Sequence, residues 1–236
     1  MNINLSELLN KDIKSQIKND LNMNDDAINE ALSAQQKRFT INTDFLSDEN
    51  LKNHIELYED YIANFNKANS KVEANDKNDV NCNHSNYRSL KLDETHNMNA
   101  VYLHEQFFSN IGDNNSNIQM DSLSYMRLAR DFGSFDNWQK DFVASACGAR
   151  NGWVITYLNT YTQTYMNAMV DSHTNNVPAG CLPIIVLDVW QHSYYRDYMK
   201  DVKTYVHAMM KQFRWNVIEE RIRKGDKVVQ VLRGQL

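Results

Sequence analysis

The spacing of hydrophobic residues predicts a long helix that begins near residue 47. From Leu51 through Tyr58 to Phe65, apolar and aromatic side chains recur every three or four residues between polar ones. Ser47 directly precedes this run and is a residue type preferred at helix N-caps. Two acidic residues follow it, where the helix dipole favours negative charge. We therefore expect an amphipathic helix with Ser47 as its N-cap.

The helical pattern is interrupted twice before the middle of the chain. Residues 67–93 are polar, rich in asparagine and nearly without periodicity, which predicts a loop or an inserted linker. A helix resumes over residues 97–108, and a second asparagine-rich loop follows at 112–117. Residues 120–150 then predict two helices that flank a turn at Gly133.

Short segments rich in aromatic and β-branched residues follow at 153–158, 166–170 and 183–187. Their composition and length are typical of strands. From residue 191 onward the helical spacing returns. Because the helices and strands are segregated along the chain, the predicted fold class is α+β: an N-terminal helical hairpin, then a small antiparallel sheet flanked by helices.

Three segments are expected from these boundaries. Residues 1–38 carry helical spacing between polar residues and predict a helical N-terminal extension. Residues 39–118 form the helical hairpin domain with its asparagine-rich insertion, and residues 119–236 form an α/β C-terminal domain.

Composition and charge exclude several classes of protein. The chain has 236 residues, of which 42% are hydrophobic and 23% charged, as in ordinary globular proteins. A net charge of -5 gives no overall basic surface for nucleic acid, so we expect no nucleic-acid partner. The three cysteines form no CxxC pair, which argues against a disulfide framework or a cysteine zinc site.

The chain also lacks the patterns of a membrane or exported protein. Its longest apolar run, residues 181–189, is too short to cross a bilayer, so we expect no membrane association. The N-terminal residues have neither the apolar core of a secretory signal nor an arginine-rich character. The expected location is the cytoplasm, with a mitochondrial location left open.

The strongest candidate for chemistry lies where the last predicted strand meets a helix. Asp188 and His192 stand four residues apart, directly after the apolar run that ends at Leu187. A buried carboxylate is costly unless it is paired, so this position suggests a cation or a hydrogen-bond network. The alternative is an aspartate that caps the helix beside a surface histidine.

Two further histidines lie on helices with aromatic neighbours. These are His54 and His104, and each alone would more often be a core residue than a ligand. Together with Asp188 and His192 they make a donor set that suits iron or manganese. His84 and His96 lie in or beside the polar loop and are expected to face solvent.

Several segments of the chain resemble the iron/manganese superoxide dismutases. DVWQHSYYRDY is similar to the DVWEHAYY motif of that family, and HTNNVPAGCLPIIVLDVW aligns with its HxTN…PLLLLDxW variant without a gap. FGSFDNWQKDF, NAVYLHEQFF and FRWNVIEER resemble further family segments. The likeness extends from about residue 45 to residue 222.

This resemblance implies a set of site residues. The ligands of one iron or manganese ion per chain would be His54, His104, Asp188 and His192. Tyr61 matches the family's gateway tyrosine, and His173 matches the outer-sphere position that tunes the potential and the proton supply of the metal.

The resemblance also implies the surroundings of the pocket and the state of assembly. Trp153 and Trp190 match tryptophans that form its walls, and Gln191 and Tyr195 belong to the surrounding residues. Gln191 replaces the glutamate that reaches a ligand histidine of the partner subunit in the family. The resemblance implies a homodimer, whose contact is weakened by the loss of the carboxylate charge at Gln191.

The first ligand position has two candidates. His54 precedes Tyr61 by seven residues, whereas the family has eight. Alignment from the start of the helix selects His54, and counting back from Tyr61 selects Asn53. The active-site histidine that the family carries between these positions is replaced by Leu57 or Tyr58.

The implied activity is conversion of superoxide to oxygen and hydrogen peroxide at a mononuclear iron or manganese site. The alternative is a non-catalytic relative that serves as a structural subunit of a larger assembly, such as a mitochondrial ribosome. A metal-dependent hydrolase has little support, because no general base is evident beside the ligands.

Overall fold

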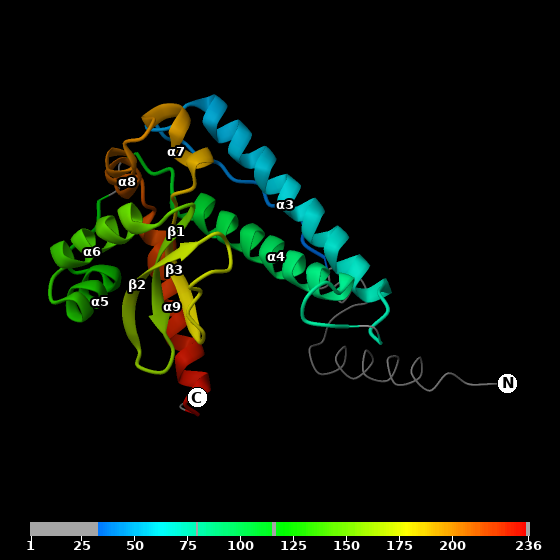
Figure 1. Cartoon of the computed structure of the whole chain (residues 1–236). Helices are drawn as coiled ribbons and strands as arrows, with labels where there is room; N and C mark the ends of the chain where they lie inside the picture. The colour runs from blue at the N-terminus through cyan, green and yellow to red at the C-terminus, as the bar shows by residue number, and fades with distance from the viewer. Residues whose placement is uncertain (1–32, 79, 115–116, 235–236) are drawn as a thin grey trace.

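The computed structural model describes residues 33–78, 80–114 and 117–234. Most of the predicted extension at 1–38 lies outside these residues, and its described part, 33–38, contains no helix. The predicted fold class is confirmed: a pair of long helices precedes a three-stranded sheet with helices around it (Figure 1). No described helix combines the length and apolarity that spanning a membrane requires.

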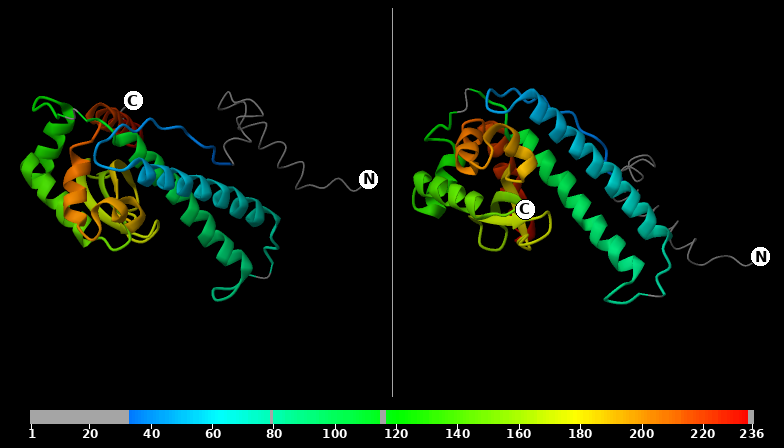
Figure 2. Two further views of the ribbon diagram at one scale, coloured as in Figure 1. Left: turned by 90° about the horizontal axis from the view of Figure 1, so that it is seen from above. Right: turned by 45° about the horizontal axis from the view of Figure 1, so that its top comes forward.

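Two long helices form the predicted hairpin. They are α3 (Asp48–Ala74) and α4 (Asn86–Asn110), which pack side by side and project from the rest of the molecule (Figure 2). Ser47 caps α3 as predicted, since its side chain accepts a hydrogen bond from the backbone N–H of Asn50 at 3.2 Å.

The predicted loop over residues 67–93 is wrong for most of its length. Helix α3 continues to Ala74, and α4 begins at Asn86 behind the N-cap Ser85, so the connection covers only residues 75–85. Ala68 and Val72 are buried within the polar stretch. Packing between two long helices stabilises these turns although the local sequence favours them weakly.

The next two helices match the prediction for residues 120–150. Helices α5 (Leu123–Phe132) and α6 (Phe135–Gly148) are separated at Gly133, which has a φ of 79°. Glycine adopts this left-handed conformation at no steric cost and so ends α5 sharply. The boundary proposed at residue 118 lies in the connection between α4 and α5 and stays a prediction.

The three predicted strands are confirmed and are each slightly longer than expected. They are β1 (Gly152–Asn159), β2 (Thr164–Asp171) and β3 (Cys181–Asp188). The antiparallel sheet has the order β2-β1-β3, with β1 in the centre. Its register places Trp153 of β1 opposite Asp188 of β3, which brings an aromatic ring to the end of the sheet where β3 stops.

Three helices complete the fold: α7 (Gln191–Tyr198), α8 (Val202–Met210) and α9 (Trp215–Leu232). Helix α9 packs closely on the sheet at Gly225, where an added Cβ would lie 2.7 Å from Leu158 Cδ2. Helix α6 is anchored by Trp138, whose indole donates a hydrogen bond to Thr156 at 3.0 Å. Helix α4 contacts β3, so α3, α4, β3 and α7 meet at one end of the sheet.

Candidate metal centre

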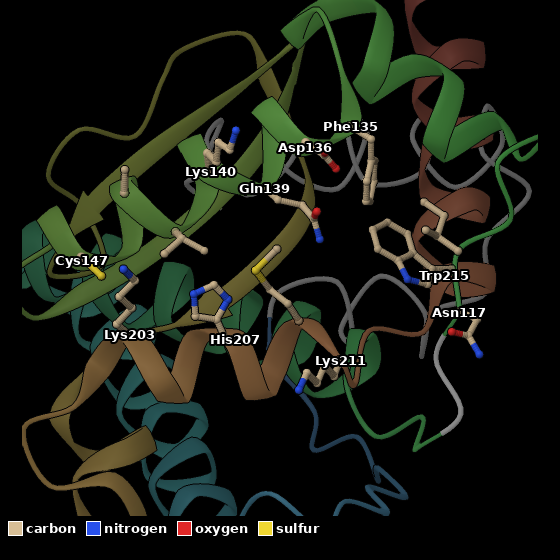
Figure 3. A pocket seen from close by; sticks show the side chains of 14 residues that line it. Asn117, Phe135, Asp136, Gln139, Lys140, Cys147, Lys203, His207, Lys211 and Trp215 are labelled. Atoms are coloured by element: carbon tan, nitrogen blue, oxygen red, sulfur yellow. The ribbon is translucent and has the colours of Figure 1, made fainter.

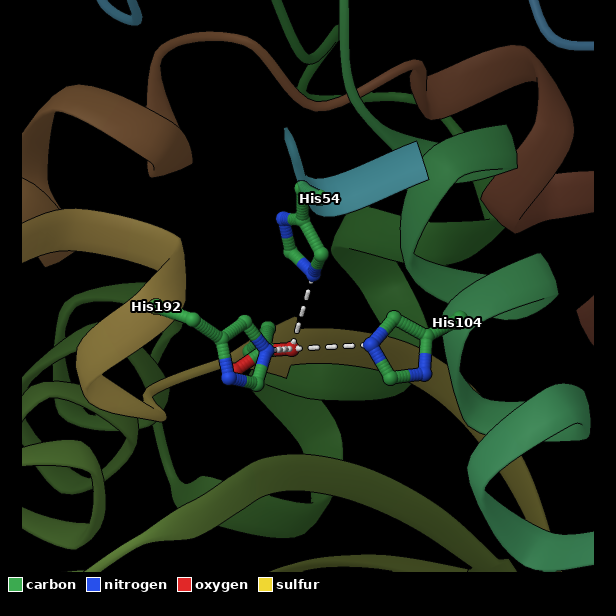
Figure 4. Close-up of side chains that lie close together, drawn as sticks. His54, His104 and His192 are labelled. Atoms are coloured by element: carbon green, nitrogen blue, oxygen red, sulfur yellow. Dashed lines mark hydrogen bonds and ion pairs between the residues drawn. The ribbon is translucent and has the colours of Figure 1, made fainter. Parts of the chain in front are cut away.

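Four side chains from four elements converge where these elements meet (Figure 4). His54 comes from α3, His104 from α4, Asp188 from the end of β3, and His192 from the first turn of α7. Their candidate ligand atoms all lie within 4.8 Å of one another. The Asp188 Oδ2 atom lies 3.2 Å from the Nε2 atoms of His54 and His192, and 3.6 Å from that of His104.

The backbone around Asp188 holds its carboxylate in place. The other carboxylate oxygen, Oδ1, accepts a hydrogen bond from the backbone N–H of Trp190 at 2.7 Å, where the chain turns into α7. The backbone carbonyl of Asp188 accepts a hydrogen bond from the Tyr205 hydroxyl at 2.7 Å. Asp188 is fully buried, and the N-cap of α7 is Trp190, so the alternative of a capping aspartate does not describe this position.

His104 is oriented by its own helix. Its Nδ1–H donates a hydrogen bond to the carbonyl of Ala100 at 2.7 Å, which leaves a lone pair on Nε2. That Nε2 atom is buried without a hydrogen-bond partner and faces the carboxylate of Asp188. A lone pair and a carboxylate oxygen repel each other unless a cation lies between them, so the donor set fits a metal ion.

The protonation states of the cluster also suit metal binding. Burial lowers the pKa of His54, and it lowers that of His104 further, so both rings are neutral near pH 7. Burial tends to raise the pKa of Asp188, but the neighbouring His192 and His54 outweigh it and hold that pKa well below its usual range. Neutral imidazoles and an ionised carboxylate are the forms that coordinate metals.

A second layer consists of Trp153, His173 and Tyr61. The indole N–H of Trp153 donates a hydrogen bond to His173 Nδ1 at 3.0 Å. Because an indole can only donate, Nδ1 is the acceptor, and the neutral ring of His173 carries its proton on Nε2. That Nε2 lies 3.1 Å from the hydroxyl of Tyr61, to which it donates. The hydroxyl proton of Tyr61 is therefore left free to donate elsewhere.

The pKa values keep this second layer in one protonation state. Burial lowers the pKa of His173 to about 4, so the ring is neutral at physiological pH. Burial also raises the pKa of Tyr61 to about 12, which keeps its hydroxyl protonated. The ring of Tyr61 packs 5.3 Å from that of His104. A neutral donor thus lies directly beside the metal centre.

His96 belongs to this layer, although the sequence predicted a solvent-facing position. The ring is half-buried and lies 4.7 Å from the ring of His173 and 6.3 Å from that of Tyr61. Burial lowers the pKa of His96. Its eight-residue spacing from His104 places both on one face of α4, and this signal could have located it.

Of the two candidates for the first ligand position, His54 is the one that lies in the cluster. Asn53 is exposed, whereas His54 is 1% exposed and reaches Asp188. Seven residues make almost two full turns of α3, so His54 and Tyr61 lie on one face of a regular helix. Between them, Tyr58 is fully buried, and its hydroxyl donates to Glu105 at 3.1 Å.

The remaining predicted residues divide into two groups. The ring of Trp153 lies 4.9 Å from that of His104, and the ring of Trp190 stacks 5.8 Å from that of His192, so both tryptophans lie beside the cluster. Gln191 and Tyr195 point outward instead and, with Asn53, line a surface hollow of about 560 Å³ beside His192. Within one chain these two residues do not enter the metal pocket.

The fold and the buried donor set define a candidate metal-binding protein, and the comparisons with known proteins assign it to a class of oxidoreductases. Residues 122–221 match the family model for the C-terminal domain of iron/manganese superoxide dismutases. The chain is 30% identical over 196 residues to the iron superoxide dismutase of Aquifex aeolicus, which covers 81% of this chain and 91% of that protein. It is 36% identical over 137 residues to manganese superoxide dismutase 1 of Halobacterium salinarum, covering 56% of this chain and 66% of that protein.

The chain belongs to the iron/manganese superoxide dismutase family. The predicted family and enzyme class are thereby confirmed, as is the prediction that the cofactor is either iron or manganese. The roles of the individual site residues stay predictions.

Proposed function

We propose that this protein dismutates superoxide, converting two superoxide anions and two protons to oxygen and hydrogen peroxide. His54, His104, Asp188 and His192 would hold one iron or manganese ion. Bound there, the metal would supply the one-electron change between its divalent and trivalent states. The observation that carries the proposal is the unpartnered Nε2 of His104, which faces the ionised carboxylate of Asp188 in a buried site.

The other residues would exclude water and hold one of the two protons that the formation of hydrogen peroxide requires. Trp153 and Trp190 cover the cluster with apolar surface. His173 donates to Tyr61 and so leaves the proton of the Tyr61 hydroxyl directed away from His173. Tyr61 would then donate to the reduced oxygen species, and solvent would replace its proton. Such a neutral donor avoids placing a second anion beside an anionic substrate.

A homodimer is part of this proposal. Gln191 and Tyr195 are exposed next to His192, whose side chain is 26% exposed and is the least buried of the cluster. A second copy seated on this face would cover that edge of the site. The amide oxygen of Gln191 could then accept a hydrogen bond from a ring N–H of the partner's His192.

The test is metal loading combined with superoxide consumption. Purified protein is reconstituted with iron or manganese, and its metal content and activity are compared with those of a His104→Leu variant. This variant removes the unpartnered nitrogen and fills the space with an apolar side chain. We expect about one ion per chain and loss of both metal and activity in the variant. Equal metal content in both proteins would show that His104 is not required to hold the metal and would contradict the observation that carries the proposal. Full metal content without activity would favour the non-catalytic alternative, which the comparisons do not support.

A further inference from the structure

A groove of about 850 Å³ lies between α6, α8 and the start of α9 (Figure 3). It shares no residue with the metal centre. Its apolar lining includes Phe135, Val143, Met210 and Trp215. Phe135 and Val143 are buried, and Met210 and Trp215 are partly exposed in the groove. The volume is within the range of small-molecule sites, and the aromatic and aliphatic lining is typical of them.

The rim of the groove is basic. Lys140 of α6 and Lys203, His207 and Lys211 of the α8 region line it, and all four are exposed. In the described part of the chain, none of the three lysines takes part in an ion pair. Asp136 is the one acidic side chain among the described lining residues. A local excess of positive charge in a chain of net charge -5 favours a negatively charged occupant at this rim.

We propose that this groove binds a small amphipathic organic anion: an apolar chain or ring system with a single carboxylate. The apolar body would lie against Phe135, Trp215 and Met210, and the carboxylate would lie near Lys203 and His207, toward the opposite end in Figure 3. Lysine stems can cover apolar surface while their ammonium groups contact a charged head. Burial of the body supplies affinity, and the rim selects the sign of charge.

Other occupants fit these observations less well. A cation would meet repulsion from the three lysines, and a neutral apolar molecule would leave their charge without a partner. A polyanion such as a nucleic acid would gain nothing from the apolar floor. The proposal is independent of the dismutase proposal, because it rests on residues outside the metal centre.

Dodecanoate is the probe for this proposal, and dodecyltrimethylammonium, which has the same chain and the opposite charge, is its control. Binding to the full-length metal-loaded protein is measured by titration calorimetry below the micelle concentration of each compound. We expect one dodecanoate per chain, a change in tryptophan fluorescence from Trp215, and at least tenfold weaker binding of the ammonium compound. Absence of dodecanoate binding, or equal binding of both compounds, would overturn the proposal.

Three variants assign the binding to this groove. Met210→Trp fills the apolar floor and should abolish binding. The pair Lys203→Glu and Lys211→Glu should weaken it by about tenfold, or about 1.4 kcal/mol. The pair Lys200→Glu and Lys227→Glu makes the same charge change on exposed positions outside the groove and should leave binding unchanged.

Superoxide decay and thermal unfolding, measured on each variant, separate a filled groove from a damaged fold. Unchanged dodecanoate binding in a folded Met210→Trp protein would place the site elsewhere. Equal losses in the two charge pairs would attribute binding to overall charge. A different outcome is an acidic peptide that binds saturably, displaces dodecanoate and binds the Met210→Trp protein more weakly. That result would make a peptide the occupant and overturn the proposal of a small anion.

Discussion

His173 donates a hydrogen bond to Tyr61, and not the reverse. The two atoms, His173 Nε2 and the Tyr61 hydroxyl, are 3.1 Å apart. The direction follows from Trp153, whose indole N–H occupies His173 Nδ1 as a donor and fixes the ring's tautomer. Trp153 of β1, which is adjacent to neither residue in the sequence, thus determines that the proton of the Tyr61 hydroxyl is available at the candidate metal centre.

Replacement of Tyr61 by phenylalanine should separate proton supply from metal binding. The variant keeps the ring beside His104 but removes the hydroxyl, so metal content should be unchanged. Superoxide decay should slow by about tenfold or more under conditions where protonation limits the rate, since a positioned proton donor contributes at least this much. Stopped-flow decay over a range of pH, with metal content measured in parallel, checks this. Unchanged decay at all pH values would contradict the assigned role of Tyr61.

The neutral state of His173 predicts acid sensitivity of folding. Its pKa is about 4 in the fold against an ordinary value of 6.5. Below pH 6.5 the unfolded chain therefore takes up a proton that the folded chain does not, and stability falls as pH decreases toward 4, by up to about 1.4 kcal/mol per pH unit. At pH above 6.5 this group makes no such difference.

A His173→Gln variant isolates this contribution. Its amide can accept from Trp153 and donate to Tyr61 but does not titrate, so its stability should fall less steeply between pH 6.5 and 4 than that of the unaltered protein. His54 and His104 contribute to both proteins equally. Urea unfolding of the metal-free proteins across this pH range makes the comparison. Identical slopes would show that His173 titrates normally.

His96 should influence the pKa of His173 by covering its ring and, when protonated, by charge repulsion. Replacement of His96 by asparagine removes a ring that lies 4.7 Å from His173 and admits water, so the pKa of His173 should rise from about 4 toward 6.5. An NMR pH titration of the histidine rings measures this shift. His84→Asn is the matched control, because His84 is exposed in the loop between α3 and α4. A similar titration of His173 in both variants would remove His96 from the second layer.

The exposed position of Gln191 predicts how a substitution at this residue changes the stability of the proposed dimer. If Gln191 reaches the partner's His192, Gln191→Glu should tighten the dimer, because a hydrogen bond to a carboxylate is roughly twice as strong as one to an amide. Sedimentation equilibrium measures the dissociation constant, with Gln230→Glu on the exposed side of α9 as the control for charge. A weaker dimer, or equal effects of both changes, would contradict this contact.

The sequence predicted the local features that depend on a few adjacent residues. Ser47 caps α3, Gly133 separates α5 from α6, and the three strands lie where β-branched and aromatic residues gather. It also placed His54, His104, Asp188 and His192 in one candidate donor set, although they are spread over 139 positions of the sequence, from 54 to 192. The resemblance to a family then implied that all four are ligands of one metal ion. Spacing along the chain alone links only Asp188 with His192.

The features that the sequence missed depend on contacts between distant elements. The polar stretch 67–93 is largely helical because α3 and α4 stabilise each other, and local periodicity does not record that pairing. His96 lies three residues beyond this stretch and was assigned to solvent for the same reason.

The most direct test of the central claim is the decay of superoxide in a stopped-flow instrument. Protein reconstituted with iron or with manganese is compared with His192→Ala and with His84→Ala, which alters an exposed histidine outside the site. We predict rapid decay with at least one metal, retained by His84→Ala and lost by His192→Ala. Decay no faster than the spontaneous reaction with either metal, in protein that holds one ion per chain, would contradict the proposed dismutase activity.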